Sequence, residues 1–160
     1  MNIFVSCSSS DKISDEYKVV TRFLMENISK DNDLVFGCAN RGLMGICYNE
    51  FLKNNRKITG VCYEMYKSDL EGLKLDEVHM VKTLEESNRF LEEFIDILEH
   101  KRTKLHNKEM IIFNINGFYD DLINMFNKIY KKVSNDYDFN SLCKVFNTAL
   151  DVTNYIEENN

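Results

Sequence analysis

The 160-residue sequence has no proline, no tryptophan and only six glycines. The missing proline and tryptophan, beside abundant asparagine and lysine, carry no functional information. Long apolar runs are also missing, and no window approaches the roughly 20 apolar residues that a membrane span needs. The start, Met1 to Val5, lacks the basic and apolar regions of an export signal. These absences predict a cytoplasmic protein that does not bind to a membrane.

Cysteine is sparse, and no pair has the C-x-x-C spacing. An odd number of widely spaced cysteines indicates neither a disulfide framework nor a zinc site. We therefore interpret them as small buried hydrophobic residues. The five are Cys7, Cys38, Cys47, Cys62 and Cys143.

Basic residues are fewer than acidic ones: the chain has 20 Lys and Arg residues and 26 Asp and Glu residues, which gives a net charge of -6. Binding to DNA or RNA depends on clustered Lys and Arg, so this balance argues against a nucleic-acid polymer as partner. A small anionic ligand is still compatible, because a helix N-terminus attracts anions locally. With 44% hydrophobic and 29% charged residues, the composition is globular. We expect a single domain over residues 1–160.

The pattern of apolar residues alternates between strand-like runs and helix-like stripes. The expected strands are 1–5, 34–36, 58–62, 78–81, 110–113 and 145–146. The expected helices are 13–28, 43–51, 84–105, 122–133 and 148–158. Asp11 or Ser14 is expected to cap the first helix, and the strand at 1–5 is expected to be buried. This alternation predicts an α/β fold, a Rossmann-like and mostly parallel sheet with helices on both faces.

Two loops are predicted at the carboxyl ends of the strands, where such sheets bind ligands. Three serines follow the first strand and can donate hydrogen bonds. The segment 37–45 follows the second strand and offers glycines for close backbone approach. The candidate nucleotide- and phosphate-binding residues are Ser8, Ser9, Ser10, Gly37, Asn40, Arg41, Gly42, Met44 and Gly45. The glycines are equally suited to shaping a tight strand-to-helix turn.

The segment 35–45 resembles the string YGGGxxGLMG of the Lonely Guy (LOG) nucleotide phosphoribohydrolases, and its last four residues match GLMG. Five other segments resemble family strings in the same order. They are 5–10 (VFCGSS), 58–61 (VIGV), 75–83 (DELHVVDT), 91–108 (LEEL through HxKP) and 114–120 (NVDGYYD). The resemblance covers nearly the whole chain and implies the family's Rossmann-like fold.

LOG proteins cleave the N-glycosidic bond of nucleoside 5′-monophosphates and release a base and ribose 5-phosphate. Their signature is PGGxGTxxE with an upstream ERK string. Here Ser87 stands where the Arg of ERK would be, and the strand with the PGGxGT loop is missing. Arg89 is displaced by two positions, about 200° around a helix. Glu93 matches the acidic residue and is the candidate catalytic residue, unless it is a solvated carboxylate beside Glu92.

The resemblance and these departures leave three hypotheses about function. The leading one is a module that senses or sequesters a phosphate-bearing nucleotide, or a nucleotide-derived signal such as an ADP-ribose species, without catalysis. The alternative is a working nucleoside 5′-monophosphate phosphoribohydrolase that uses Glu93. The third is a degenerate protein that acts through its oligomer surface. LOG relatives form homodimers through their long helices, and the 84–105 helix has an apolar excess that suits a partner helix.

No cofactor or metal ion is expected. The three histidines are dispersed, without a nucleophile at a recognisable elbow. The carboxylate pair Asp120 and Asp121 lacks partners at metal-site spacing, and we interpret it as a helix start.

Overall fold

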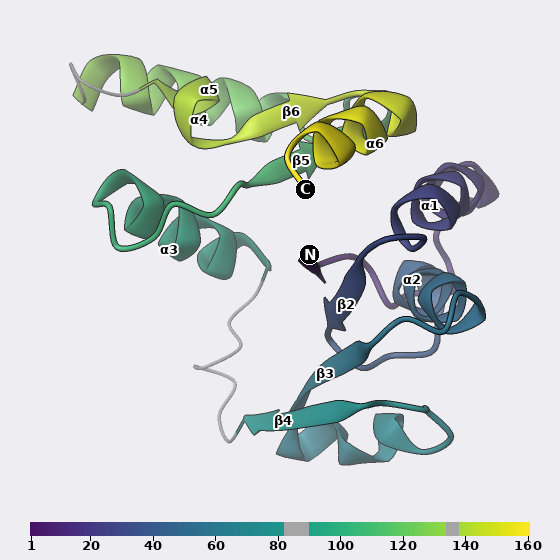
Figure 1. Cartoon of the computed structure of the whole chain (residues 1–160). Coiled ribbons are helices and arrows are strands. Elements are labelled where there is room, and N and C mark those ends of the chain that lie inside the picture. Colours follow the sequence, from purple (N-terminus) through teal and green to yellow (C-terminus); the bar gives the residue numbers. More distant parts are fainter. Residues whose placement is uncertain (82–89, 134–137) are drawn as a thin grey trace. The chain divides into compact units, whose positions relative to one another are not determined.

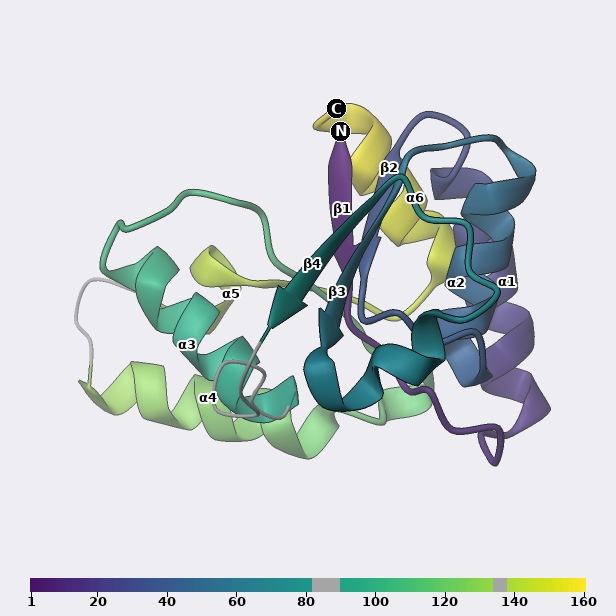
Figure 2. The ribbon, with the colours of Figure 1, turned by 90° about the horizontal axis from the view of Figure 1, so that it is seen from below.

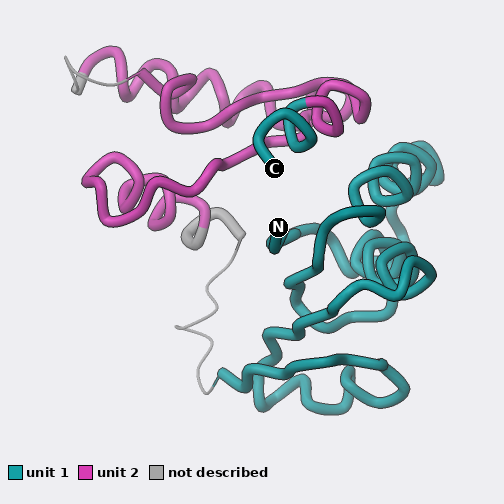
Figure 3. The backbone as a smooth tube through the Cα atoms, in the orientation of Figure 1, with its two compact units in different colours: residues 1–88, 155–160 teal, residues 89–154 magenta. Residues whose placement is uncertain are grey.

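The structure is a computed structural model that describes residues 1–81, 90–133 and 138–160. Their α/β architecture is drawn in Figure 1. The chain forms two compact units, Met1–Asn88 with Tyr155–Asn160, and Arg89–Asn154 (Figure 3). The prediction of one domain over residues 1–160 stays a prediction.

The first unit contains a four-stranded parallel sheet with the strand order β1-β2-β3-β4. Its strands are β1 (Asn2–Val5), β2 (Asp33–Phe36), β3 (Ile58–Tyr63) and β4 (Glu77–Val81). Its helices are α1 (Asp15–Ile28), α2 (Gly42–Lys53) and the short 3-10 helix η1 (Glu64–Leu70). Figure 2 shows α1 and α2 side by side on one face of the sheet. This unit confirms the predicted α/β, Rossmann-like fold.

The covered face of the sheet is apolar because alternate residues of neighbouring strands share it. Leu34 of β2 pairs in register with Ile58 of β3, and both are almost fully buried. Phe36 is fully buried and stacks on Tyr48 of α2, with 5.9 Å between ring centroids. Burying each of these side chains contributes about 1.5–3 kcal/mol. The predicted buried strand at 34–36 is therefore confirmed.

The prediction that residues 1–5 form a buried strand is half right. β1 forms, and it pairs with β2 at one edge of the four-stranded sheet of the first unit. Phe4 is 49% exposed, while Ile3 and Val5 are half-buried. A short apolar run predicts extended structure, but it does not distinguish a central strand from an edge strand.

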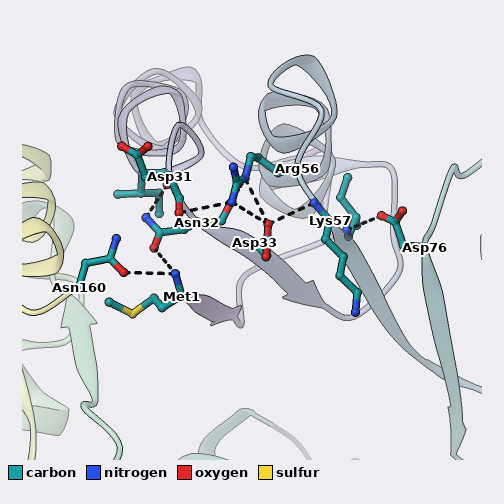
Figure 4. Close-up of polar contacts among 10 residues, drawn as sticks. Met1, Asp31, Asn32, Asp33, Arg56, Lys57, Asp76 and Asn160 are labelled. Atoms are coloured by element: carbon teal, nitrogen blue, oxygen red, sulfur yellow. Dashed lines mark hydrogen bonds and ion pairs between the residues drawn. The ribbon is translucent and has the colours of Figure 1, made fainter.

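The amino ends of the strands are tied together by charged and polar side chains (Figure 4). The Asp33 carboxylate at the start of β2 accepts hydrogen bonds from Arg56 Nε and from the Lys57 backbone N–H, both at 3.2 Å. The Asp76 carboxylate accepts from the Ile58 backbone N–H at 2.7 Å. These contacts fix the start of β3 against both of its neighbours.

The second unit packs helices on a two-stranded parallel sheet, β5-β6. Its elements are α3 (Phe90–Arg102), β5 (Ile111–Phe113), η2 (Ile115–Gly117), α4 (Asp120–Val133), α5 (Phe139–Leu142), β6 (Lys144–Phe146) and the first part of α6 (Ala149–Glu158). Phe126 of α4 stacks on Phe139 of α5, with 5.2 Å between ring centroids, and Leu98 of α3 is fully buried beside them. Asp120 and Asp121 begin α4, as predicted.

The predicted helix 84–105 is shorter at its carboxyl end. α3 ends at Arg102, Lys104 adopts a left-handed φ of 60°, and Leu105 is 73% exposed. Leu105 is therefore not part of a buried helical stripe. Residues 84–89 lie outside the described residues, so a homodimer through this helix stays a prediction.

Four of the five cysteines are buried, as predicted, and Cys7 is half-buried. All five are free thiols. Burial is the main cause that raises the pKa of Cys38 and of Cys143 to about 12. Among the described helices, none combines the length and the apolar character needed to cross a bilayer.

Candidate functional site

The two predicted ligand loops meet in the first unit. One follows β1 and carries the three serines, and the other follows β2 and leads into α2. The Ser8 carbonyl accepts hydrogen bonds from the backbone N–H groups of Leu43 at 2.9 Å and Met44 at 3.3 Å. The serine loop, residues 6–10, is thus fastened to the first turn of α2, at the carboxyl ends of two adjacent parallel strands.

The glycines of this turn are required by close packing. Gly42 has φ +57°, and a Cβ added there would lie 2.7 Å from the Ser10 carbonyl oxygen. A Cβ on Gly45 would lie 2.9 Å from the backbone carbonyl carbon of Asn40. Gly37 is open on one side and is approached by the Met44 side chain, whose Cε would be 3.3 Å from an added Cβ. The sequence left open whether these glycines approach a ligand or shape the strand-to-helix turn. Close packing in the turn explains why glycine is needed at Gly42 and Gly45.

The serine loop has its own internal hydrogen bonds. Ser8 Oγ accepts from the Ser10 backbone N–H at 3.1 Å, and Ser10 Oγ accepts from the Lys12 backbone N–H at 3.3 Å. Each hydroxyl therefore uses a lone pair on the protein and keeps a proton that can be donated elsewhere. Ser9 is half-buried, and its backbone carbonyl carbon packs close to Gly42.

The N-terminus of α2 already holds an anion that belongs to the protein. The Gly42 backbone N–H donates to the Asp11 carboxylate at 2.9 Å. The next two N–H groups donate to Ser8, and the Gly45 N–H donates to the Arg41 carbonyl at 3.0 Å. All four N–H groups of the first turn are satisfied internally, and the Asp11 charge benefits from the positive end of the helix dipole.

This arrangement corrects the prediction for Asp11. The N-cap residue of α1 is Ser14, one of the two predicted candidates, and its side chain makes no capping hydrogen bond. Asp11 caps α2 instead, 31 residues away along the chain. Sequence reasoning missed this role because a capping pattern is recognised only next to its own helix.

The two polar residues predicted to contact a ligand also have protein partners. Arg41 Nη2 lies 3.2 Å from the Asp69 carboxylate of η1, and the Arg41 side chain is half exposed. Asn40 Oδ1 accepts from Asn49 Nδ2 of α2 at 3.1 Å. Exposed ion pairs of this kind contribute little to stability, so Arg41 can exchange Asp69 for another anion at small cost. No local sequence pattern marks Asp69 or Asn49 as partners.

The remaining candidate residues belong to the second unit or lie outside the described residues. Glu93 is on α3, but its side chain is outside the described residues, as are Ser87 and Arg89. Within the described ranges, no group of three or more His, Cys, Asp or Glu residues is arranged to hold a metal ion. An open groove of about 850 Å³ in the second unit is lined partly by Lys101, Lys104 and His106, none of them a predicted site residue.

No family model matches the chain. Three relatives carry nearly the same name. Probable cytokinin riboside 5′-monophosphate phosphoribohydrolase LOG4 of Oryza sativa subsp. japonica is 24% identical over 63% of this chain and 52% of its own length. Probable cytokinin riboside 5′-monophosphate phosphoribohydrolase LOGL1 of the same plant is 25% identical, over 64% of this chain and 54% of its own length. Cytokinin riboside 5′-monophosphate phosphoribohydrolase LOG1 of Arabidopsis thaliana is 25% identical over 79% of this chain and 67% of its own length.

These matches confirm the resemblance to the LOG proteins. The chain spans about half the length of the two rice relatives.

Proposed function

We propose that this chain, a relative of the LOG phosphoribohydrolases, binds a nucleoside 5′-monophosphate and hydrolyses its N-glycosidic bond. The names of the relatives support this reaction above binding alone, since they specify the removal of a phosphoribosyl group from a riboside 5′-monophosphate.

The observation that carries the proposal is the junction of the serine loop with α2. The Ser8 carbonyl receives the Leu43 and Met44 N–H groups, so the serine loop lies against the first turn of α2. The first-turn N–H groups are already engaged, so the donors that suit a phosphate or a ribose are the Ser8 and Ser10 hydroxyls, which keep their protons. Arg41 supplies a positive charge at the same end of the sheet once it leaves Asp69.

The reaction adds water to C1′ of the ribose, and the base leaves with a proton. Its transition state resembles an oxocarbenium ion, which a carboxylate stabilises. The family resemblance assigns that carboxylate to Glu93. The serine loop and Arg41 would bind the 5′-phosphate or ribose, with Asp69 released from Arg41.

A second candidate function, binding without turnover, is favoured by one observation. The sequence retains only Glu93 of the PGGxGTxxE signature. A chain of this kind would hold a nucleotide, or an ADP-ribose species, intact.

The two candidates are separated by incubating the purified chain with AMP, other nucleoside monophosphates, ADP-ribose and cyclic ADP-ribose isomers. The released and the heat-extracted fractions are then analysed by chromatography. Free base together with ribose 5-phosphate supports hydrolysis. An intact compound that is released only by heating supports binding without turnover. If the chain neither binds nor converts any compound of the panel, both candidate functions are contradicted.

The role of Glu93 is tested by Glu93→Gln, with Glu92→Gln as the matched control on the same helix. We expect Glu93→Gln to lower turnover of AMP about a hundredfold or more, since the lost carboxylate acts on the reacting centre. Glu92→Gln is expected to leave turnover within a factor of about two. Equal losses in both variants would rule out a specific role for Glu93.

A further inference from the structure

Two free cysteines are in contact where the serine loop meets α2. Cys7 is part of that loop, directly before Ser8, and Cys47 is in the second turn of α2. Their Sγ atoms are 3.9 Å apart, although 40 positions separate them in the sequence. A disulfide requires an Sγ–Sγ distance of about 2.05 Å, so a local shift of roughly 2 Å would join them.

The two thiols differ in exposure to solvent, and this difference determines which of them an oxidant reaches first. Cys47 of α2 is fully buried, whereas Cys7 is only half-buried. An oxidant in solution therefore reaches Cys7 first. The contact with Cys7 and burial both raise the pKa of the Cys47 thiol well above its ordinary value, so Cys47 reacts only in a step that also takes up its proton.

We propose that Cys7 and Cys47 form a reversible disulfide that locks the serine loop onto α2. The bond would pull on Cys7, because α2 is anchored in the core by Phe51, which is fully buried, and by the Phe36–Tyr48 stack. The movement falls on the residue next to Ser8, whose carbonyl receives the Leu43 and Met44 N–H groups. The lock thus acts on the junction that forms the candidate site.

The oxidant is a hydroperoxide, and the reaction balances in two steps. The Cys7 thiolate attacks one peroxide oxygen, which leaves a sulfenic acid on Cys7 and releases water once hydroxide is protonated. The Cys47 sulfur then attacks the Cys7 sulfur, the S–O bond breaks, and the departing hydroxide takes the Cys47 proton as a second water. Two thiols are oxidised by two electrons, and one hydrogen peroxide is reduced to two waters. A dithiol reductant reverses the bond by exchange.

The test is to treat the full chain with hydrogen peroxide and to map the disulfides by mass spectrometry of non-reduced peptides. We expect a single intramolecular link between the peptides of Cys7 and Cys47, with loss of the mass of two hydrogen atoms and recovery after dithiothreitol. Cys7→Ser should abolish the link. Cys7 is the safer position to change because it is half-buried, and Cys47→Ala provides the second variant. Cys38→Ala is the matched control, since that thiol is fully buried and outside the pair.

Two further measurements test the lock. Amide hydrogen exchange in residues 6–12 is expected to slow in the oxidised chain and to be unchanged by peroxide in Cys7→Ser. Affinity for AMP should fall about tenfold on oxidation, the loss of about one hydrogen bond to the ligand. The expected loss of affinity for AMP rests on the proposed function. If the reduced chain does not bind AMP, the proposed function fails. The disulfide mapping and the hydrogen-exchange data would still show whether the disulfide between Cys7 and Cys47 forms and restrains the serine loop. Peroxide that leaves Cys7 reduced, or as a stable sulfenic acid, would overturn the proposal, and so would a bond between two chains.

Discussion

Replacing Gly42 by alanine tests how the serine loop and α2 are packed. The substitution has two costs. An L-residue at φ +57° occupies the left-handed region, which costs about 1–2 kcal/mol. The new Cβ would also lie 2.7 Å from the Ser10 carbonyl oxygen, a backbone atom that can move only with its loop. Forced shifts of this kind cost about 1–3 kcal/mol. We expect Gly42→Ala to lower the free energy of unfolding by about 2–5 kcal/mol.

Gly72 provides the matched control. Its φ is +79°, but a Cβ there meets no atom within 4 Å. Gly72→Ala should therefore cost only the conformational part, about 1–2 kcal/mol. The smaller entropy of the unfolded chain is common to both variants and cancels in the comparison. The difference between the two measures the contact of the new Cβ with the Ser9 and Ser10 backbone.

The assay is urea unfolding followed by far-ultraviolet circular dichroism, because the chain has no tryptophan to report by fluorescence. Gly42→Ala should have a lower midpoint than Gly72→Ala at the same slope. Equal midpoints would show that the serine loop moves away from the new Cβ at no cost in free energy, which would contradict a tight junction between this loop and α2.

Asp11→Ala removes the acceptor of the Gly42 N–H and should lower the free energy of unfolding by about 0.5–2 kcal/mol. Asp11→Asn, which keeps an acceptor, should lose less, and equal losses in urea unfolding would argue against the cap. Tyr130→Phe removes a hydroxyl that donates to Glu99 at 2.6 Å and should cost about 0.5–3 kcal/mol. That hydrogen bond is also the largest cause that lowers the pKa of Glu99 in the folded chain. The hydrogen bond therefore stabilises the fold fully above the ordinary glutamate pKa, and this stabilisation is lost as the pH falls through the lowered pKa of the folded chain. Acid titration of stability should thus show a smaller loss in Tyr130→Phe, and identical acid profiles would contradict this assignment.

The sequence predicted the elements of the fold well where periodicity is strong. The run at 34–36 becomes a buried strand, and the stripe at 122–133 becomes most of α4. It did not predict that β1 lies at the edge of its sheet, because strand order depends on contacts between distant segments. The end of α3 was placed too late, since the exposed Leu105 fits the apolar spacing by coincidence.

The candidate site was predicted as a meeting of two loops, and the structure brings those loops together. The internal partners were not predictable in the same way. Asp11 and Gly42 are 31 positions apart, and Arg41 and Asp69 are 28 apart. A carboxylate that is so far away in the sequence leaves no local pattern beside the group it binds. The sequence therefore indicated which groups could bind a ligand, but not which of them already bind another residue of the protein.

The ties at the amino ends of the strands have a consequence for how this scaffold can be changed. A slip of one residue in β2 or β3 would turn every side chain of that strand to the opposite face. Asp33 and Asp76 prevent this slip from the end of the sheet that carries no ligand loop. Register is therefore specified separately from recognition. A change in the loops at 6–10 and 37–41 costs stability at their junction with α2 but leaves the contacts that align the strands in place.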